Sequence, residues 1–176
     1  MALTIADRSS ADELVYSIRA WNFQDRYIRH KNFMTYLDQI GLNDEQAAKD
    51  ATFYLRDPLR RPVTDTNCYT LGAQYLKGYY LRHRQFRLVL AKFDQNDSNF
   101  GGDATFCLRK DLAGKGYSFE SLNYPGYFIR HANFELWVNK NDGSTGFKRD
   151  ATFDLVHPVH APMTIDPGTN QVPSTD

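Results

Sequence analysis

Three histidines recur along the chain, and each is followed at nearly the same distance by an aspartate. The separations are 20, 20 and 19 residues for the pairs His30 and Asp50, His83 and Asp103, and His131 and Asp150. A carboxylate accepts hydrogen bonds from two neighbouring hydroxyl groups, and a neutral imidazole donates one hydrogen bond and accepts another. Pairs of these residues therefore suit a shallow site for a molecule rich in adjacent hydroxyl groups, such as a sugar.

Each histidine and aspartate belongs to a longer unit that occurs three times. The unit reads YIRHKNF in the first copy, YLRHRQF in the second and YFIRHANF in the third, and DATF follows each of them. Tyr16, Tyr69 and Tyr117 precede the three histidines by 14 residues, so the copies align there without a gap. The repeats span about 14–59, 67–112 and 116–158. Such a repeat indicates three structural units that share one core.

Every repeat contains four short strand-like segments and no convincing helix longer than two turns. The segments are 15–21, 26–30, 34–38 and 51–56, then 68–73, 78–83, 87–93 and 104–109, then 117–122, 127–131, 135–139 and 151–156. Twelve strands must hide their edges, and closure into a barrel does so. We therefore predict an all-β chain with the β-trefoil fold, in which three four-stranded repeats form a six-stranded barrel capped by hairpins. A two-sheet sandwich is the alternative, but it gives no reason for a threefold period.

Four columns of aligned apolar residues are predicted to form the core. They are Ile18, Leu71 and Phe119; Ile28, Leu81 and Ile129; Phe33, Phe86 and Phe134; and Phe53, Phe106 and Phe153. The polar stretch 39–49 of the first repeat is expected to form one helical turn.

Composition and the chain ends limit the classes of partner. The chain carries 21 basic and 21 acidic residues without a Lys/Arg run, so we expect no nucleic-acid partner. No stretch approaches the ~20 apolar residues of a membrane span, so no membrane partner is expected.

We predict one domain over 14–158, a leader or linker over 1–13, and a linker tail over 159–176 that is rich in Pro, Thr and Asn. A monomer is expected.

Cys68 and Cys107 both fall in the middle repeat. Neither belongs to a Cys-x-x-Cys or Cys/His cluster, so the sequence supports no metal site and no cofactor. The two residues could form one disulfide in a secreted protein, or they could be two small buried apolar side chains. A metal shared among the three histidines is disfavoured because the repeats place them around an axis rather than together.

The histidine–aspartate pairs also have a purely structural interpretation. Strand alternation places each histidine on the same face as a core residue, so its aspartate could hold it at the barrel rim, or the aspartate could cap a turn. The adjacent arginines lie on the opposite strand face and are expected to form ion pairs or hydrogen bonds between repeats; they are Arg29, Arg82 and Arg130.

The third repeat looks best equipped for a ligand. Tyr124, seven residues before His131, offers a ring that could stack on the C–H face of a sugar. Glu120 adds a second carboxylate to that of Asp150. The aligned positions hold Phe23 and Arg19 in the first repeat, and Leu76 and Gly72 in the second. We therefore expect Tyr124 and Glu120 to join His131 and Asp150 in one site.

The stretch SFESLNYPGYFIRHANFELWV, residues 118–138, followed by DATF at 150–153, resembles carbohydrate-binding module family 42. Members are β-trefoil modules of α-L-arabinofuranosidases and related hemicellulases, and the resemblance covers about 14–158. It implies a non-catalytic module that binds terminal arabinofuranose of arabinoxylan or arabinan through the histidine and aspartate of each repeat, with Tyr124 stacking. It also implies a secreted protein whose polypeptide carries a catalytic or scaffold module that acts on plant cell walls.

Two other classes of function compete with this interpretation. A glycosidase needs two carboxylates at a set separation, and only the third repeat offers a pair, Glu120 with Asp150. We therefore expect the chain not to be an enzyme. An inhibitor or protein-interaction module would depend on one asymmetric loop, whereas the polar columns of this chain recur in all three repeats.

Overall fold

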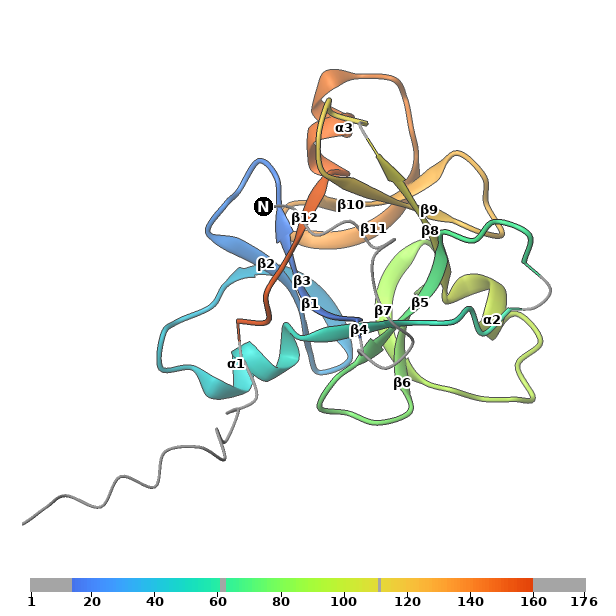
Figure 1. The fold of residues 1–176 in the computed structure, drawn as a ribbon, viewed down its shortest axis with the longest axis horizontal. Coiled ribbons are helices and arrows are strands. Elements are labelled where there is room, and N and C mark those ends of the chain that lie inside the picture. Colours follow the sequence, from blue (N-terminus) through green and yellow to red (C-terminus); the bar gives the residue numbers. More distant parts are fainter. Residues whose placement is uncertain (1–13, 61–62, 111, 160–176) are drawn as a thin grey trace, which may run out of the picture.

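The computed structural model describes residues 14–60, 63–110 and 112–159 (Figure 1). The predicted leader, residues 1–13, and the predicted tail from residue 160 onward lie outside the described residues. In the described part, four strands and one short helix follow one another in every repeat. None of the helices in these ranges is both long and apolar enough to cross a membrane.

The elements of the three repeats correspond one to one. The first repeat contains β1 (Leu14–Ala20), β2 (Arg26–Lys31), β3 (Met34–Gln39), α1 (Glu45–Asp50) and β4 (Phe53–Arg56). The second contains β5 (Cys68–Ala73), β6 (Tyr79–Arg84), β7 (Arg87–Lys92), α2 (Phe100–Asp103) and β8 (Thr105–Lys110). The third contains β9 (Tyr117–Ser121), β10 (Tyr127–Ala132), β11 (Glu135–Lys140), α3 (Thr145–Asp150) and β12 (Phe153–Val156). All twelve predicted strands are therefore present.

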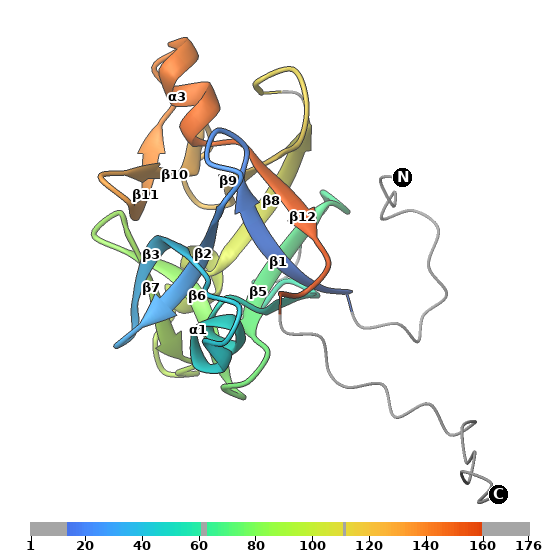
Figure 2. The same ribbon diagram turned by 90° about the vertical axis from the view of Figure 1, so that its left-hand side faces the viewer.

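Six of the strands close into a barrel. The antiparallel pairings run β1–β4, β4–β5, β5–β8, β8–β9, β9–β12 and β12–β1, so the last strand returns to the first. Figure 2 shows β12 beside β1, where the two ends of the repeated chain meet. The closed ring leaves none of these six strands as a free sheet edge.

The other six strands form three hairpins that cap the barrel. The hairpins are β2–β3, β6–β7 and β10–β11, and their second strands pair with one another through β3–β7, β7–β11 and β11–β3. Viewed down the short axis, the molecule has three lobes with a helix in each (Figure 1). The predicted β-trefoil is confirmed.

The barrel interior is filled by three of the four predicted columns. Their members are no more than 1% exposed: Ile18, Leu71, Phe119, Ile28, Leu81, Ile129, Phe53, Phe106 and Phe153. The fourth column was wrong, because Phe33 and Phe134 are 53% and 42% exposed. These phenylalanines lie at the hairpin tips, where the chain reverses before it can continue the inward alternation of the strand.

The hairpin tips adopt a left-handed backbone that favours glycine. The φ angles of Phe33, Phe86 and Phe134 are 62°, 63° and 58°. In this conformation their carbonyl oxygens accept hydrogen bonds of 2.8 Å from the backbone N–H groups of Leu90, Val138 and Leu37, each in the next hairpin around the axis. These cyclic bonds between hairpins offset the backbone strain, which costs of order 1–3 kcal/mol for a non-glycine residue.

An arginine is buried where the three hairpins meet. Arg87 is 8% exposed, and its aligned positions hold Met34 and Glu135. Its guanidinium donates to the carbonyl oxygen of Thr35 at 2.6 Å and to that of Leu136. The cap therefore departs from threefold symmetry in its polar contacts.

Cys68 and Cys107 face each other across the β5–β8 pair and form a disulfide. The bond joins two barrel strands of the middle repeat, so the two residues form a disulfide and are not two separate buried thiols. Among the described residues, the grouping that could hold a metal ion is Asp65 with these two cysteines, and the disulfide leaves neither sulfur as a thiolate.

Candidate functional site

The short helices position the three aspartates. Asp50, Asp103 and Asp150 are the last residues of α1, α2 and α3. The Ala-Thr-Phe that follows locks each helix end onto the barrel: the alanines and phenylalanines are buried. Each threonine hydroxyl donates a hydrogen bond to the backbone carbonyl oxygen four residues earlier in the chain. The distances are 2.8 Å for Thr52, 2.7 Å for Thr105 and 2.6 Å for Thr152. The motif thereby fixes each carboxylate against the neighbouring hairpin.

Only the helix of the first repeat was expected from its sequence. The stretches that become α2 and α3 are rich in Gly, Asn, Asp and Ser, which are typical of turns. The Ser144 side chain caps α3 by accepting from the N–H of Phe147 at 3.1 Å, whereas Asn99 makes no side-chain cap bond at α2. Packing of the buried Phe100 and Phe147 therefore decides these helices more than local propensity does.

Each histidine lies beside the aspartate of its own repeat, as the sequence predicted. The imidazole Nε2 is 3.7, 3.4 and 3.6 Å from a carboxylate oxygen in the pairs His30–Asp50, His83–Asp103 and His131–Asp150. The histidines come from β2, β6 and β10, whose ends face the helix termini.

The preceding arginines bind the same carboxylates. The ion-pair distances are 3.6, 2.5 and 2.8 Å for Arg29–Asp50, Arg82–Asp103 and Arg130–Asp150. The sequence analysis expected ion pairs or hydrogen bonds of these arginines between repeats. The ion pairs with the aspartates are present, but each of them joins two residues of the same repeat, so the expected location was wrong. The helix end lies at the hairpin edge, where residues from both strand faces reach the carboxylate.

An asparagine from the next repeat completes the cluster around His83. Asn123 Nδ2 donates to Asp103 Oδ1 at 2.7 Å, and Asn123 Oδ1 lies 2.9 Å from His83 Nε2. Because the carboxylate can only accept, the amide oxygen faces the histidine, and His83 Nε2 carries the hydrogen that it donates. Ser121 Oγ donates to the same amide oxygen at 2.9 Å. This cluster therefore spans the second and third repeats.

The same arrangement joins the third repeat to the first. Asn22 Nδ2 donates to Asp150 Oδ1 at 2.9 Å, and His131 Nε2 donates to Asn22 Oδ1 at 2.8 Å. The sequence analysis missed both asparagines. A signal existed, because Asn22 and Asn123 each precede the histidine of their own repeat by eight residues. That spacing does not reveal that each asparagine contacts the histidine of the preceding repeat.

The cluster around His30 differs from the other two. The position aligned with the asparagines holds Tyr75, which is 43% exposed and has Lys49 Nζ at 5.8 Å from its ring centre. Asp50 instead accepts from Gln46 Nε2 of its own helix at 2.8 Å. The His30 cluster thus lacks the amide that bridges the histidine and aspartate elsewhere.

Aromatic rings edge the two asparagine-containing clusters, and they also come from the next repeat. The Tyr124 ring lies 5.4 Å from the His83 ring and 5.1 Å from that of Phe86. Phe23 lies 5.4 Å from His131. The expectation that Tyr124 stands beside His131 was wrong, because a trefoil places the start of each repeat against the hairpin of the preceding one.

Glu120 does not join His131 and Asp150 either. Its carboxylate accepts from Arg109 Nε at 2.6 Å and from the N–H of Gly126 at 2.8 Å. Asp150, in contrast, binds Arg130 and Asn22. The expected pairing of the two carboxylates was therefore wrong, since each belongs to its own network of hydrogen bonds.

Burial favours the neutral form of two of the histidines. Burial lowers the pKa of His30 and of His131, although the carboxylates of Asp50 and Asp150 act in the opposite direction. The neutral imidazole of His131 then donates one hydrogen bond from Nε2 to Asn22 Oδ1.

The lowered pKa values predict how stability depends on pH. Below about pH 6.5 the unfolded chain takes up protons on His30 and His131 that the folded chain does not, which favours unfolding. The free energy of unfolding should therefore rise between about pH 5 and pH 7. Urea titrations at both pH values should show a smaller rise in the double variant His30→Gln/His131→Gln, and an equal or larger rise would contradict the assignment.

Known proteins resemble this chain over nearly all of its length. Residues 4–55, 58–154 and 112–165 match the family model described as the alpha-L-arabinofuranosidase B (ABFB) domain. The chain belongs to this family. An arabinofuranosidase/B-xylosidase of Trichoderma koningii is 30% identical to this ABFB domain over 131 residues, which are 73% of this chain and 25% of that protein. Alpha-L-arabinofuranosidase B of Emericella nidulans is 28% identical over 156 residues, 86% of this chain and 29% of that protein.

A solved structure shows the same fold. The crystal structure of an arabinofuranosidase complexed with arabinofuranosyl-alpha-1,2-xylobiose superposes on this ABFB domain with a TM-score of 0.72 and 25% identity, covering 86% of this chain and 32% of that one. The chain thus spans about a quarter to a third of its relatives. It corresponds to the ABFB domain of such enzymes rather than to the whole polypeptide.

Proposed function

We propose that this ABFB domain is a non-catalytic module that binds terminal α-L-arabinofuranose side chains of arabinoxylan or arabinan. The observation that carries the proposal is the cyclic cluster of histidine, aspartate and asparagine, found twice between repeats with an aromatic ring at its edge. The binding of these groups to a sugar needs no bond breaking and no cofactor. Carboxylate oxygens accept from adjacent hydroxyl groups, and the ring covers a C–H face.

The two complete clusters are the sites that we assign to arabinofuranose. The side chains of Asp103 and Asp150 are 13% and 25% exposed, so each carboxylate is fixed by its partners yet partly open to solvent. His83, Asp103 and Tyr124 form one site, and His131, Asp150 and Phe23 form the other. His30 and Asp50 form a third site that is weaker, because Tyr75 replaces the bridging amide.

Each site should bind one sugar weakly. A terminal pentose has about ten heavy atoms, and its hydroxyl groups exchange hydrogen bonds with water for hydrogen bonds with protein. We therefore expect a dissociation constant on the order of 1 mM, which corresponds to a binding free energy of about −4 kcal/mol. Several sites on one decorated polymer raise the apparent affinity through their effective concentration. The partner is therefore a polysaccharide that displays many side chains.

The greater length of the relatives supports a role for this domain beside a catalytic module of the same polypeptide. Because the chain matches about a quarter of an arabinofuranosidase, we propose that it directs a catalytic module of the same polypeptide to the plant cell wall outside the cell. A glycosidase within this domain is disfavoured, since Glu120 and Asp150 belong to separate hydrogen-bond networks.

Affinity electrophoresis tests the proposal. The purified chain should be retarded in gels that contain arabinoxylan or arabinan. It should migrate freely in gels that contain the same xylan after its arabinose has been removed. No retardation by either decorated polymer would refute arabinofuranose binding, and release of arabinose from a chromogenic arabinofuranoside by the pure chain would refute the non-catalytic role.

A further inference from the structure

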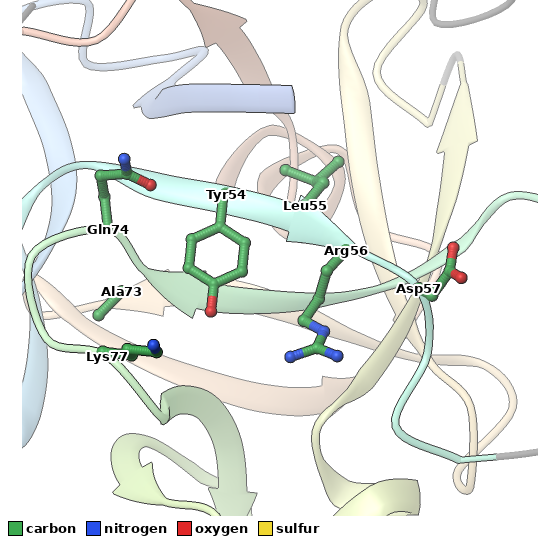
Figure 3. Close-up of a pocket in the computed structure, with 7 residues that line it drawn as sticks. All are labelled: Tyr54, Leu55, Arg56, Asp57, Ala73, Gln74 and Lys77. Atoms are coloured by element: carbon green, nitrogen blue, oxygen red, sulfur yellow. The ribbon is translucent and has the colours of Figure 1, made fainter. Parts of the chain in front are cut away.

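A surface hollow lies on the barrel wall, where the first repeat meets the second. Tyr54, Arg56, Asp57, Gln74 and Lys77 line a hollow of about 550 Å³ together with Leu55 and Ala73 (Figure 3). None of the histidines and aspartates of the three clusters lines it. The hollow is therefore not accounted for by arabinofuranose binding.

The floor of the hollow is a tyrosine ring that lies on a glycine. Tyr54 of β4 is the register partner of Gly72 on β5. A Cβ atom on Gly72 would come within 2.3 Å of Tyr54 Cζ, so any other residue would push the ring away. One face of the ring thus rests on the backbone, while the ring also lines the hollow (Figure 3).

This arrangement departs from the threefold pattern. The aligned strand pairs hold Asp154 opposite Arg19, and Cys107 opposite Glu120. Charged side chains cover the barrel wall there, because Arg19 pairs with Asp154 at 3.2 Å and Glu120 with Arg109 at 2.6 Å. Only at the junction of the first two repeats does a glycine leave room for an aromatic ring on the wall.

Two cations flank the ring. Figure 3 shows Lys77 on one side of Tyr54 and Arg56 on the other, with Asp57 farther along the chain. Arg56 Nη1 donates to the hydroxyl of Tyr80 at 2.7 Å, and this contact orients the guanidinium beside the hollow. A guanidinium has five N–H donors in a planar fork that matches a carboxylate, and a lysine adds a point charge.

We propose that this hollow binds a uronic acid unit of a polysaccharide. Tyr54 stacks on the C–H face of the pyranose ring, Arg56 and Lys77 bind its carboxylate, and the Gln74 amide bonds to its hydroxyl groups. A neutral sugar would use the ring and the amide but would offer no carboxylate to Arg56 and Lys77. The ligand class is therefore set by the combination of a stacking surface with two flanking cations. The proposal does not depend on arabinofuranose binding.

Nuclear magnetic resonance titration of the ¹⁵N-labelled chain tests the site with three probes. Methyl glucuronide should shift the amide signals of Gly72, Gln74 and Lys77, whereas methyl glucoside, which lacks the carboxylate, should bind about tenfold more weakly. Inorganic phosphate reports on charge alone. Equal binding of the glucuronide and glucoside would overturn the role of the cations, and equal binding of phosphate and glucuronide would overturn the role of the ring.

Four variants locate the binding. Lys77→Ala should weaken glucuronide binding several-fold, and Tyr54→Leu should weaken both sugars, while Lys140→Ala removes an exposed lysine of the third repeat and should change nothing. Thermal melts establish that each variant is folded. The double variant Asp103→Asn/Asp150→Asn should bind glucuronide as the unaltered chain does. Loss of glucuronide binding in that variant would place the ligand at the histidine clusters and overturn the second site.

Discussion

The double variant Asp103→Asn/Asp150→Asn should lose nearly all retention on arabinoxylan. Each substitution replaces a carboxylate, which accepts from two hydroxyl groups, by a neutral amide that accepts at one atom only. A hydrogen bond to a charged group contributes about 1.5–3 kcal/mol, so each site should weaken by about ten- to a hundredfold. Because the polymer engages both sites together, the two losses should multiply in affinity electrophoresis.

The matched control is Asp50→Asn in the cluster that lacks the asparagine. Its effect should be no more than about twofold, since that site contributes least to the combined affinity. Isothermal titration with an arabinofuranosyl oligosaccharide should show one site fewer in each of the single variants Asp103→Asn and Asp150→Asn. If Asp50→Asn matched the double variant in its loss of retention, the ranking of the clusters would be wrong. Asp103 and Asp150 also bind Arg82 and Arg130, so thermal melts must accompany each comparison.

Arg87→Met should lower the free energy of unfolding by about 3 kcal/mol without altering the sugar sites. Methionine is the residue at the aligned position of the first repeat, Met34, and it has a similar length. The substitution leaves the carbonyl oxygens of Thr35 and Leu136 without the guanidinium that now donates to them in the buried cap. Each buried acceptor that loses its partner costs about 1–3 kcal/mol.

Urea denaturation of the two proteins measures this difference, and retention on arabinoxylan measured in native gels serves as the control. A variant with unchanged stability would show that the carbonyl oxygens do not need the arginine. A variant that is stable but no longer retained would show that the cap also shapes the sugar sites.

The fold could be predicted because its signal is repeated three times. One copy of the strand pattern would have left the topology open, but three copies with a common spacing demand three packed units. This equivalence is seen in Ile28, Leu81 and Ile129, which occupy aligned positions and are each 0% exposed. The phenylalanines of the hairpin tips were misplaced since they follow the strand without continuing its alternation, and the sequence does not mark where a hairpin reverses.

The candidate site could be predicted only within a repeat. His83 and Asp103 were correctly brought together, because both belong to one copy of the unit. Asn123 and Tyr124 were not assigned to them, although both lie in the same aligned columns as Asn22 and Phe23. Spacing along the chain does not report which repeat follows which around a closed barrel, and that order decides which side chains meet.

The two asparagine-containing clusters each draw on two repeats, so no single repeat carries a complete one. The second repeat holds His83 and Asp103 but depends on the third for Asn123, and the third depends on the first for Asn22. An excised repeat would therefore lack a complete cluster, whereas a symmetric trimer of the third repeat would rebuild three identical clusters, since that repeat contains both the histidine–aspartate pair and the asparagine. The two clusters share no residue, so each junction between repeats could be redesigned without altering the other.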